Sequence, residues 1–316
     1  PTIVVHPEAC KGMEMPTAML GDGAHLVNAN GERFMFRYNP DHGEMQIEKA
    51  RMSLCIQREI DEGRGFPDRS VLFDTTKLAA DRLESYVSHC RRLRAAGLDP
   101  ASSGPQVRPA AHSHMGGALI DERTFTGVPG LFAAGEAAGG VHGASRIAGN
   151  GASDVIVFGG IAGKAAASQG LDIASRQWRR VHDQALGALR RAQRRSGDLR
   201  PEIVKIALRE ILLDAAGLYR NEGALARGAS RLEELQQRMD ADMAADNPGE
   251  SVRALQAANM LLVGRMIIAS ARAREESRGA HQRTDFAARD DANWLRHTGI
   301  CKDRTGAIAL EAVPIR

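Results

Sequence analysis

A glycine-rich loop that leads directly into an apolar segment occupies the middle of the 316-residue chain. Five glycines lie within residues 137–151, and the apolar segment 155–167 follows with the length and composition of a helix. Upstream, a turn at Val128-Pro129-Gly130 leads into an apolar run, residues 131–134, which we expect to be a short strand. A strand, a glycine loop and a helix start expected at 150–154 direct backbone N–H groups toward an electron-rich ligand.

The first third of the chain mixes short apolar runs with loops. The runs at residues 2–5 and 71–73 predict short strands. Apolar residues recur at helical spacing over residues 45–60, which predicts a helix that ends at Gly63-Arg64-Gly65. A second helix is expected over residues 76–96.

Residues 172–275 consist almost entirely of helix formers, with breaks predicted at Ser196-Gly197-Asp198, Gly228 and Asn247-Pro248-Gly249. We expect three or four helices, one of which starts near Pro201 with the preceding aspartate as its cap. The apolar face that packs an antiparallel bundle is predicted to be Ile203, Ile206, Ala207, Ile211 and Leu212.

The length of 316 residues predicts about two domains, and the overall composition is that of a globular protein. Lys and Arg total 42 against 39 Asp and Glu, and the formal charge of +3 is too small to indicate a polyanionic partner. Aromatic residues make up only 4%, which disfavours a protein that binds nucleic acid by base stacking. We therefore expect no nucleic-acid partner.

Cysteine spacing argues against metal sites built from cysteine, and hydropathy argues against a membrane span. Cys10, Cys55, Cys90 and Cys301 include no CxxC pair, so we predict reduced thiols, no zinc site and no cysteine-ligated iron–sulfur cluster. No apolar run reaches the roughly 18 to 20 residues of a membrane span, and no secretion signal is recognised. We expect a cytoplasmic chain without a membrane span of its own.

Polar side chains gather in the glycine-rich loops between residues 112 and 154. The motifs are His112-Ser113-His114-Met115-Gly116-Gly117, Gly135-Glu136, Val141-His142-Gly143-Ala144-Ser145-Arg146 and Gly149-Asn150-Gly151. Histidine, glutamate and arginine with little bulk around them suit a ligand site, although spacing alone also allows structural turns with incidental polar residues.

These motifs resemble those of the flavoprotein subunit of succinate dehydrogenase and fumarate reductase, a family that includes L-aspartate oxidase. The similarity covers residues 111–117, 130–140 and 141–163 and extends to both ends of the chain. His6-Pro7 and Asn30-Gly31-Glu32-Arg33-Phe34 resemble the capping domain of the family. Its C-terminal region is matched by Glu276-Ser277-Arg278-Gly279-Ala280-His281 and Asp290-Asp291-Ala292-Asn293-Trp294.

The resemblance implies an α+β fold, in which a capping domain and part of an FAD-binding α/β domain precede a helical bundle. The implied divisions are a capping (substrate) domain, the returning part of the FAD-binding domain, a helical bundle and a C-terminal tail, at residues 1–108, 109–170, 171–275 and 276–316. In the family, a Rossmann-like segment with a GxGxxG fingerprint holds the FAD dinucleotide, and this sequence contains no such pattern. We expect that N-terminal half of the FAD site to come from elsewhere.

The resemblance places the FAD contacts of this chain in two segments. Glu136, together with Gly135, resembles the acidic residue near the ribityl chain of the flavin. The helix start whose N–H groups face the pyrimidine edge of the flavin is matched by Asn150, Gly151, Ala152 and Ser153. A helix N-terminus at that edge stabilises the negative charge of reduced flavin.

The resemblance also implies catalytic residues. His112 and Arg146 match a histidine and an arginine that bind a substrate carboxylate, since a guanidinium can bind a carboxylate through two parallel hydrogen bonds. His6 matches a further substrate histidine, although a lone histidine is more often structural. Lys49 lies where the family has an acid/base arginine, with Arg51 nearby. Lysine can carry a proton, but Lys49 is also compatible with a solvated helix residue.

Two departures from the family pattern concern the substrate. Pro16-Thr17 lies where the family has a Thr-Glu pair, and Glu8-Ala9 follows His6-Pro7 in place of Thr-Gly. The loss of a hydroxyl and a carboxylate changes what the second end of a dicarboxylate would contact. The resemblance therefore indicates flavoprotein ancestry more firmly than succinate or fumarate as the substrate.

We expect an FAD-dependent oxidoreductase that transfers hydride between flavin and a small carboxylate and is incomplete without the other FAD-binding half. The implied partners are a chain carrying that half and an iron–sulfur electron-transfer subunit, through which the protein would associate with a membrane. The Arg278 motif matches a region of the family that contacts the electron-transfer partner. Two alternatives stay open, namely amino-acid oxidation like that of L-aspartate oxidase and a non-catalytic assembly or scaffold remnant that binds no flavin.

Overall fold

The computed structural model describes residues 2–147, 149–169, 179–184, 186–187 and 197–315. The chain divides into two compact units, Pro1–His114 and Met115–Arg316, and the predicted α+β class is confirmed. The four-part division stays a prediction, and the start of its third part, residue 171, lies outside the described residues.

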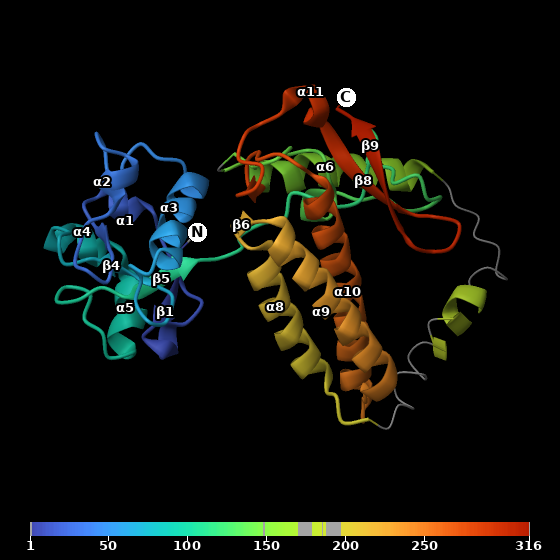
Figure 1. The fold of residues 1–316 in the computed structure, drawn as a ribbon, viewed down its shortest axis with the longest axis horizontal. Coiled ribbons are helices and arrows are strands. Elements are labelled where there is room, and N and C mark those ends of the chain that lie inside the picture. Colours follow the sequence, from blue (N-terminus) through green and yellow to red (C-terminus); the bar gives the residue numbers. More distant parts are fainter. Residues whose placement is uncertain (1, 148, 170–178, 185, 188–196, 316) are drawn as a thin grey trace. The chain divides into compact units, whose positions relative to one another are not determined.

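An antiparallel five-stranded sheet organises the first unit, with the strand order β2-β1-β5-β4-β3 (Figure 1). The strands are β1 (Thr2–His6), β2 (Glu14–Met15), β3 (His25–Val27), β4 (Val71–Asp74) and β5 (Gln106–Pro109). The strands predicted at 2–5 and 71–73 are therefore confirmed as β1 and β4. Alternate strand residues are buried in the core, among them Val4, Leu26, Val71, Phe73 and Val107.

The helices of the first unit differ from the prediction at two boundaries. They are η1 (Glu8–Cys10), α1 (Ala18–Gly21), α2 (Met35–Tyr38), α3 (Lys49–Asp61), α4 (Ala80–Ser85) and α5 (Val87–Ala95). The helix predicted over 45–60 starts only at Lys49, because Gln46 has a positive φ of 51° and Glu48 is extended. The helix predicted over 76–96 is split into α4 and α5 at Tyr86, whose backbone is not helical and whose hydroxyl donates to Asp22.

A buried carboxylate fixes the C-terminal end of α3. Glu59 is fully buried and accepts hydrogen bonds from Arg64 Nε (2.8 Å), Asn28 Nδ2 (2.9 Å) and the Tyr38 hydroxyl (2.6 Å). Burial alone would raise the pKa of Glu59, but the hydrogen bonds from Arg64, Asn28 and Tyr38 lower it to about 2. The helix ends as predicted, since Gly63 follows with φ 78°.

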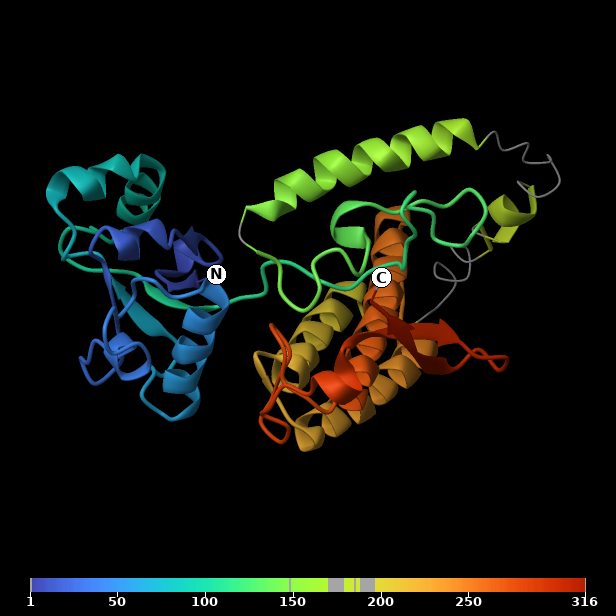
Figure 2. The same ribbon diagram turned by 90° about the horizontal axis from the view of Figure 1, so that it is seen from above.

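The second unit contains a helical bundle and several shorter elements. Among the described residues its elements include η2 (Gly135–Ala137), α6 (Asn150–Ser168), α8 (Pro201–Ala216), β6 (Tyr219–Arg220), α9 (Glu222–Asp242), α10 (Pro248–Ala273), β7 (Gln282–Arg283), α11 (Asp291–Trp294), β8 (Arg296–Lys302) and β9 (Ile308–Pro314). Helices α8, α9 and α10 lie side by side around a common apolar core, which confirms the predicted bundle (Figures 1 and 2). Asn247 caps α10 and Pro248 occupies its first turn, as the predicted break implies.

The buried face of α8 agrees with the predicted one only in part, since Ile211 is buried and Ala207 and Leu212 pack against the core. Ile203 and Ile206 are 54% and 49% exposed, whereas Val204, Leu208, Ile211 and Ala215 are buried. Two sets of apolar residues at helical spacing overlap in α8. The set that packs in the core is Val204, Leu208, Ile211 and Ala215, which are spaced by four, three and four residues.

The start of α8 differs in one respect from the prediction. Pro201 does open the helix, but Asp198 is not its cap, because the capping residue is Arg200. Ser196, the first residue of the break predicted before this helix, lies outside the described residues.

Gly228 does not break a helix but allows two helices to approach closely. It is buried inside α9, where a Cβ atom would lie 2.3 Å from Ala215 Cβ of α8 and 3.0 Å from Ile268 Cδ1 of α10. The absence of a side chain therefore sets the distance between these helices.

We expect Gly228→Ala to lower the free energy of unfolding of the second unit by about 2 kcal/mol, because the overlap with Ala215 outweighs the better helix propensity of alanine. Denaturant unfolding followed by the helical circular dichroism signal would measure the change. Gly223→Ala, in the first turn of the same helix, is the matched control, since its Cβ would meet only ordinary contacts at 3.4 Å. Equal effects of the two substitutions would contradict the close-approach explanation.

Two other segments differ from their prediction. The prediction of a strand over residues 131–134 is wrong. Within the described chain, Phe132 makes only an isolated bridge with Phe125, and no strand pairs with residues 131–134. The C-terminal region predicted as a polar tail instead forms α11 and a hairpin of β8 and β9, paired from Arg296↔Pro314 to Lys302↔Ile308.

Among the described helices, α10 is long and apolar enough to cross a membrane by length and composition. Its apolarity has another explanation, because Ala254, Ala257, Leu261 and Ile268 are buried against the other bundle helices. The four cysteines are free thiols, as predicted.

Candidate functional site

The N-terminus of α6 is shaped by glycine. The helix begins at Asn150, within the predicted start at 150–154, and its capping residue Gly149 has a left-handed φ of 88°. Glycine tolerates this conformation and provides no side chain that would cover the N–H groups of the first turn. Small residues follow, Gly151 and Ala152, so the helix terminus suits a negatively charged ligand edge.

Several of the predicted site residues come together at this helix terminus. A Cβ atom on Gly151 would lie 3.3 Å from Arg146 Nη1, so the Arg146 side chain lies against the first turn of α6. Gly135, with φ 67°, packs so closely on α6 that a Cβ would lie 2.9 Å from Val155 Cγ1. Glu136, the next residue of η2, is exposed beside this contact.

The Gly116-Gly117 part of the histidine motif supports η2 from another direction. The Ala118 N–H donates to the Ala137 carbonyl (2.8 Å), and the Gly139 N–H donates back to the Ala118 carbonyl (2.9 Å). A Cβ on Gly117 would lie 2.4 Å from the Ala137 carbonyl oxygen. Gly117 therefore allows the close approach through which Ala118 holds η2 in place by backbone hydrogen bonds.

In the first unit, Lys49 lies beside a shallow hollow. The hollow has a volume of about 370 Å³ and is lined by Glu14, Pro16, Thr17, Ala18, Lys49 and His89. Lys49 is the first residue of α3, and the hollow brings it together with Pro16 and Thr17, two of the positions that depart from the family pattern.

Sequence reasoning missed Glu14 and His89 in this hollow. His89 Nε2 lies 3.2 Å from the Glu14 carbonyl oxygen, which connects α5 to β2 across 75 residues of sequence. Because this contact is long-range, no local signal in the sequence identifies it.

The other predicted residues of the first unit are separate positions on its surface. His6 is exposed at the end of β1, where it pairs with Gln106, and His112 is exposed a few residues after β5. Arg51 is exposed on α3 and does not line the hollow. His112 belongs to the first unit and Arg146 to the second. The catalytic and cofactor-binding roles assigned to all of these residues stay predictions.

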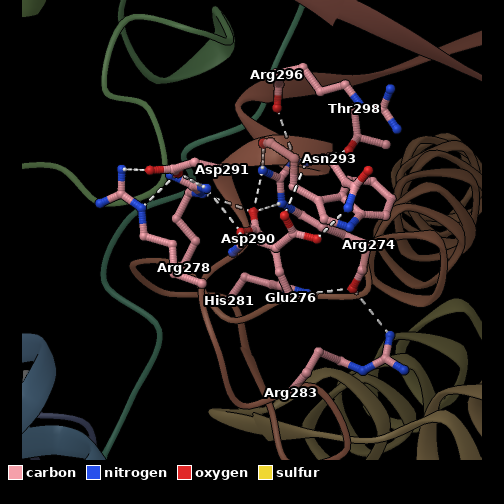
Figure 3. Close-up of polar contacts among 12 residues, drawn as sticks. Arg274, Glu276, Arg278, His281, Arg283, Asp290, Asp291, Asn293, Arg296 and Thr298 are labelled. Atoms are coloured by element: carbon pink, nitrogen blue, oxygen red, sulfur yellow. Dashed lines mark hydrogen bonds and ion pairs between the residues drawn. The ribbon is translucent and has the colours of Figure 1, made fainter.

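The C-terminal motif forms a buried ionic cluster centred on Glu276 (Figure 3). The carboxylate is fully buried and accepts hydrogen bonds from Arg274 Nε (2.9 Å), Arg278 Nε (2.8 Å) and the Asp290 N–H (3.0 Å). Arg278 also pairs with Asp291, and its side chain is only 15% exposed. Arg278 thus holds the C-terminal segment together, whereas contact with an electron-transfer partner stays a prediction.

His281 lies at the edge of the same cluster as a neutral ring. Burial and the neighbouring Arg220 guanidinium lower the pKa of His281 to about 4. A neutral imidazole accepts from Arg220 Nη1 through Nδ1 (2.9 Å) and donates from Nε2 to the Arg274 carbonyl (3.2 Å).

Two protein families match the chain. The family described as FAD binding domain matches residues 1–152, and the family described as fumarate reductase flavoprotein C-term matches residues 205–316. One subunit of the fumarate reductase (CoM/CoB) of Methanothermobacter marburgensis is 35% identical over 90% of this chain and 52% of its own length. L-aspartate oxidase of Streptomyces coelicolor is 32% identical over 99% of this chain and 54% of its own length.

A solved structure agrees with these sequence matches. The E. coli quinol fumarate reductase aligns with 100% of this chain and 57% of that chain, with a TM-score of 0.87 and 28% identity. This chain belongs to the succinate dehydrogenase and fumarate reductase flavoprotein family. It spans about half the length of the curated relatives it matches, so it corresponds to part of a family flavoprotein.

Proposed function

We propose that this chain provides the substrate-binding part and a portion of the FAD-binding part of an oxidoreductase that acts on a small carboxylate. The observation that carries the proposal is the contact of Arg146 with the first turn of α6. A planar guanidinium binds carboxylates, and an uncovered helix N-terminus suits an anionic ring edge. Their adjacency supports a site in which a carboxylate substrate meets a flavin.

The residues present at α6 fit FAD. Gly135 and Glu136 would hold the ribityl side, and residues 150–153 would offer their N–H groups to the pyrimidine edge. When bound, FAD supplies the hydride chemistry of the reaction. The fit rests on Gly149, because a capping side chain at that position would cover the first-turn N–H groups.

Side chains of this chain are proposed to bind the substrate and to transfer a proton. Arg146 binds a carboxylate of the substrate, and the family resemblance assigns substrate contacts to His112 and His6 as well. Lys49 moves the proton at the substrate carbon, since an ammonium group can donate a proton that the amine later takes back. Arg51 adds positive charge on the same helix, which favours an anionic substrate.

Part of the proposal is that the other FAD-binding half covers α6. Val155, Ile156 and Val157 are 52%, 73% and 54% exposed, and Gly159 and Gly160 have open space where a Cβ would be. Figure 2 shows α6 as a long helix, and Gly135 of η2 packs against Val155 of this helix. An exposed apolar helix needs a partner surface, and glycines allow a backbone to approach closely.

The M. marburgensis relative is named as one subunit of its enzyme, which supports further subunits here. That one of them is an iron–sulfur electron-transfer subunit is part of the proposal and follows the family resemblance. A cytoplasmic location, with membrane association only through such partners, belongs to the same proposal.

Amino-acid oxidation is the second candidate, supported by the similarity to L-aspartate oxidase and by the altered positions Pro16 and Thr17. Thr17 lies where the family has a glutamate, so a hydroxyl replaces the carboxylate that would contact one end of the substrate. A scaffold remnant without flavin is the third alternative, and the exposed face of α6 suits it equally.

Coexpression with the dinucleotide-binding half of a relative tests the proposal. We expect a yellow complex with absorbance near about 450 nm that turns over fumarate or succinate, whereas preferred turnover of aspartate would support the second candidate. Ile156→Glu should weaken association of the halves, and Ile315→Glu, which alters a residue 54% exposed in the C-terminal segment, is its control. A stable but colourless complex would support the scaffold and contradict the enzyme.

A further inference from the structure

The segment that carries Arg146, residues 141–147 and called here the Arg146 loop, contacts two different elements of the second unit. Glycines with positive φ flank the arginine, Gly143 at 58° and Gly149 at 88°. Such residues leave the backbone of the loop with few intrinsic constraints. The position of the guanidinium therefore depends on contacts that the loop makes elsewhere.

The first contact is a buried pair of side chains. His142 Nε2 lies 3.1 Å from Asp154 Oδ2, and the two side chains are only 15% and 5% exposed. The other oxygen, Asp154 Oδ1, is buried without a hydrogen-bond partner among the described residues. A buried carboxylate that loses a hydrogen-bond donor incurs a desolvation cost. The contact between His142 and Asp154 therefore ties the start of the loop to α6.

The second contact joins the loop to the C-terminal segment. The Ala280 N–H donates to the Ala144 carbonyl (3.0 Å), two residues before Arg146. Gly279 has φ 56°, and a Cβ there would lie 2.5 Å from the same carbonyl oxygen. The segment is itself fixed, because Glu276 binds Arg278 and Gln282 Nε2 donates to the Gly279 carbonyl (2.8 Å).

We propose that His142, Asp154 and Gly279 are positioning residues that hold Arg146 against the first turn of α6. Asp154 of α6 holds His142 and the Gly279 segment holds Ala144, so the backbone that leads into Arg146 is fixed by two elements that are far apart in sequence. The catalytic consequence rests on the proposed function of Arg146, whereas the structural consequence does not.

Hydrogen exchange of the 316-residue chain, followed by mass spectrometry, tests the structural part. We expect the amides of the Arg146 loop to exchange faster in His142→Ala, Asp154→Ala and Gly279→Ala, with the circular dichroism spectrum retained. The conservative variant His142→Gln keeps a donor and Asp154→Asn keeps an acceptor. Both should preserve slow amide exchange in the Arg146 loop.

The chain offers a matched control for each change. His182 and Asp183 lie 3.5 Å apart but are 67% and 78% exposed, so His182→Ala should leave exchange in the loop unchanged. Gly306 has φ 86° with open space around it, so Gly306→Ala controls for the strain of alanine at positive φ. Native exchange in the loop for both His142→Ala and Gly279→Ala would overturn the proposal.

Kinetics of the flavin-loaded complex test the catalytic part. Displacement of the guanidinium should raise KM for the carboxylate substrate on the order of tenfold and lower kcat less, with recovery in His142→Gln. An unchanged KM alongside faster exchange would overturn the link to Arg146. If the complex never binds flavin, the proposed function fails, while the exchange measurement still decides whether the loop is held.

Discussion

Glu276→Gln should lower the free energy of unfolding of the second unit by about 3 kcal/mol, because removing one charge from a buried ionic cluster leaves its partners uncompensated. The amide keeps one acceptor oxygen but cannot serve Arg274, Arg278 and the Asp290 N–H together. Denaturant unfolding monitored by tryptophan fluorescence would report the loss, since Trp294 stacks on Arg274 in the same cluster.

The same cluster predicts how stability depends on pH. Burial would raise the pKa of Glu276, but hydrogen bonds from Arg278, the Asp290 N–H and Arg274 outweigh it, and the pKa is lowered. A carboxyl group with a lowered folded-state pKa contributes stability above its unfolded-state pKa and loses it as the pH falls through the folded-state value. The unfolding free energy of the native chain should therefore fall with acid more steeply than that of Glu276→Gln.

Glu222→Gln is the matched control for this prediction. Glu222 also pairs with an arginine, Arg272, but the two side chains are 51% and 41% exposed. Exposed ion pairs contribute little because water and salt screen them. A loss of stability in Glu222→Gln as large as that in Glu276→Gln would contradict the importance of burial.

The parts of the fold that the sequence predicted have local causes. The end of α3 and the start of α6 follow from glycines at positive φ, at Gly63 and Gly149, next to runs with clear helical character. The cap and first turn of α10 follow from Asn247 and Pro248. These signals lie within a few residues of the structure they determine.

The failures have a different origin, since they depend on residues far apart in sequence. The choice between two apolar stripes on α8 is made by packing against α9 and α10, and Gly228 looked like a helix break because its neighbour Ala215 is distant in sequence. Residues 131–134 have the composition of a strand but lack a strand to pair with in the described chain.

The candidate site shows the same division. Family motifs led to Arg146, Gly135 and residues 150–153, which the fold brings together at α6. Nothing local connects His142 with Asp154, or Ala144 with Ala280, and both contacts were missed for that reason.

Arg146→Gln should reduce kcat/KM of the flavin-loaded complex for its carboxylate substrate by about a hundredfold or more, because the amide cannot replace a bidentate charge-assisted contact. Arg146→Lys should recover only part of the loss, since an ammonium group keeps the charge without the planar pair of donors. Steady-state kinetics with each candidate substrate would measure both variants, and flavin absorbance would show that each still binds its cofactor.

A control variant separates the loss of the Arg146 guanidinium from the mere loss of one positive charge on the protein. Arg304, exposed in the turn between β8 and β9, is the matched control, and Arg304→Gln should leave kcat/KM unchanged. If Arg146 binds the substrate carboxylate, its loss should also weaken inhibition by a non-reacting dicarboxylate, in parallel with the rise in KM. Full activity in Arg146→Gln would exclude this guanidinium from substrate binding and leave α6 as a flavin-binding element alone.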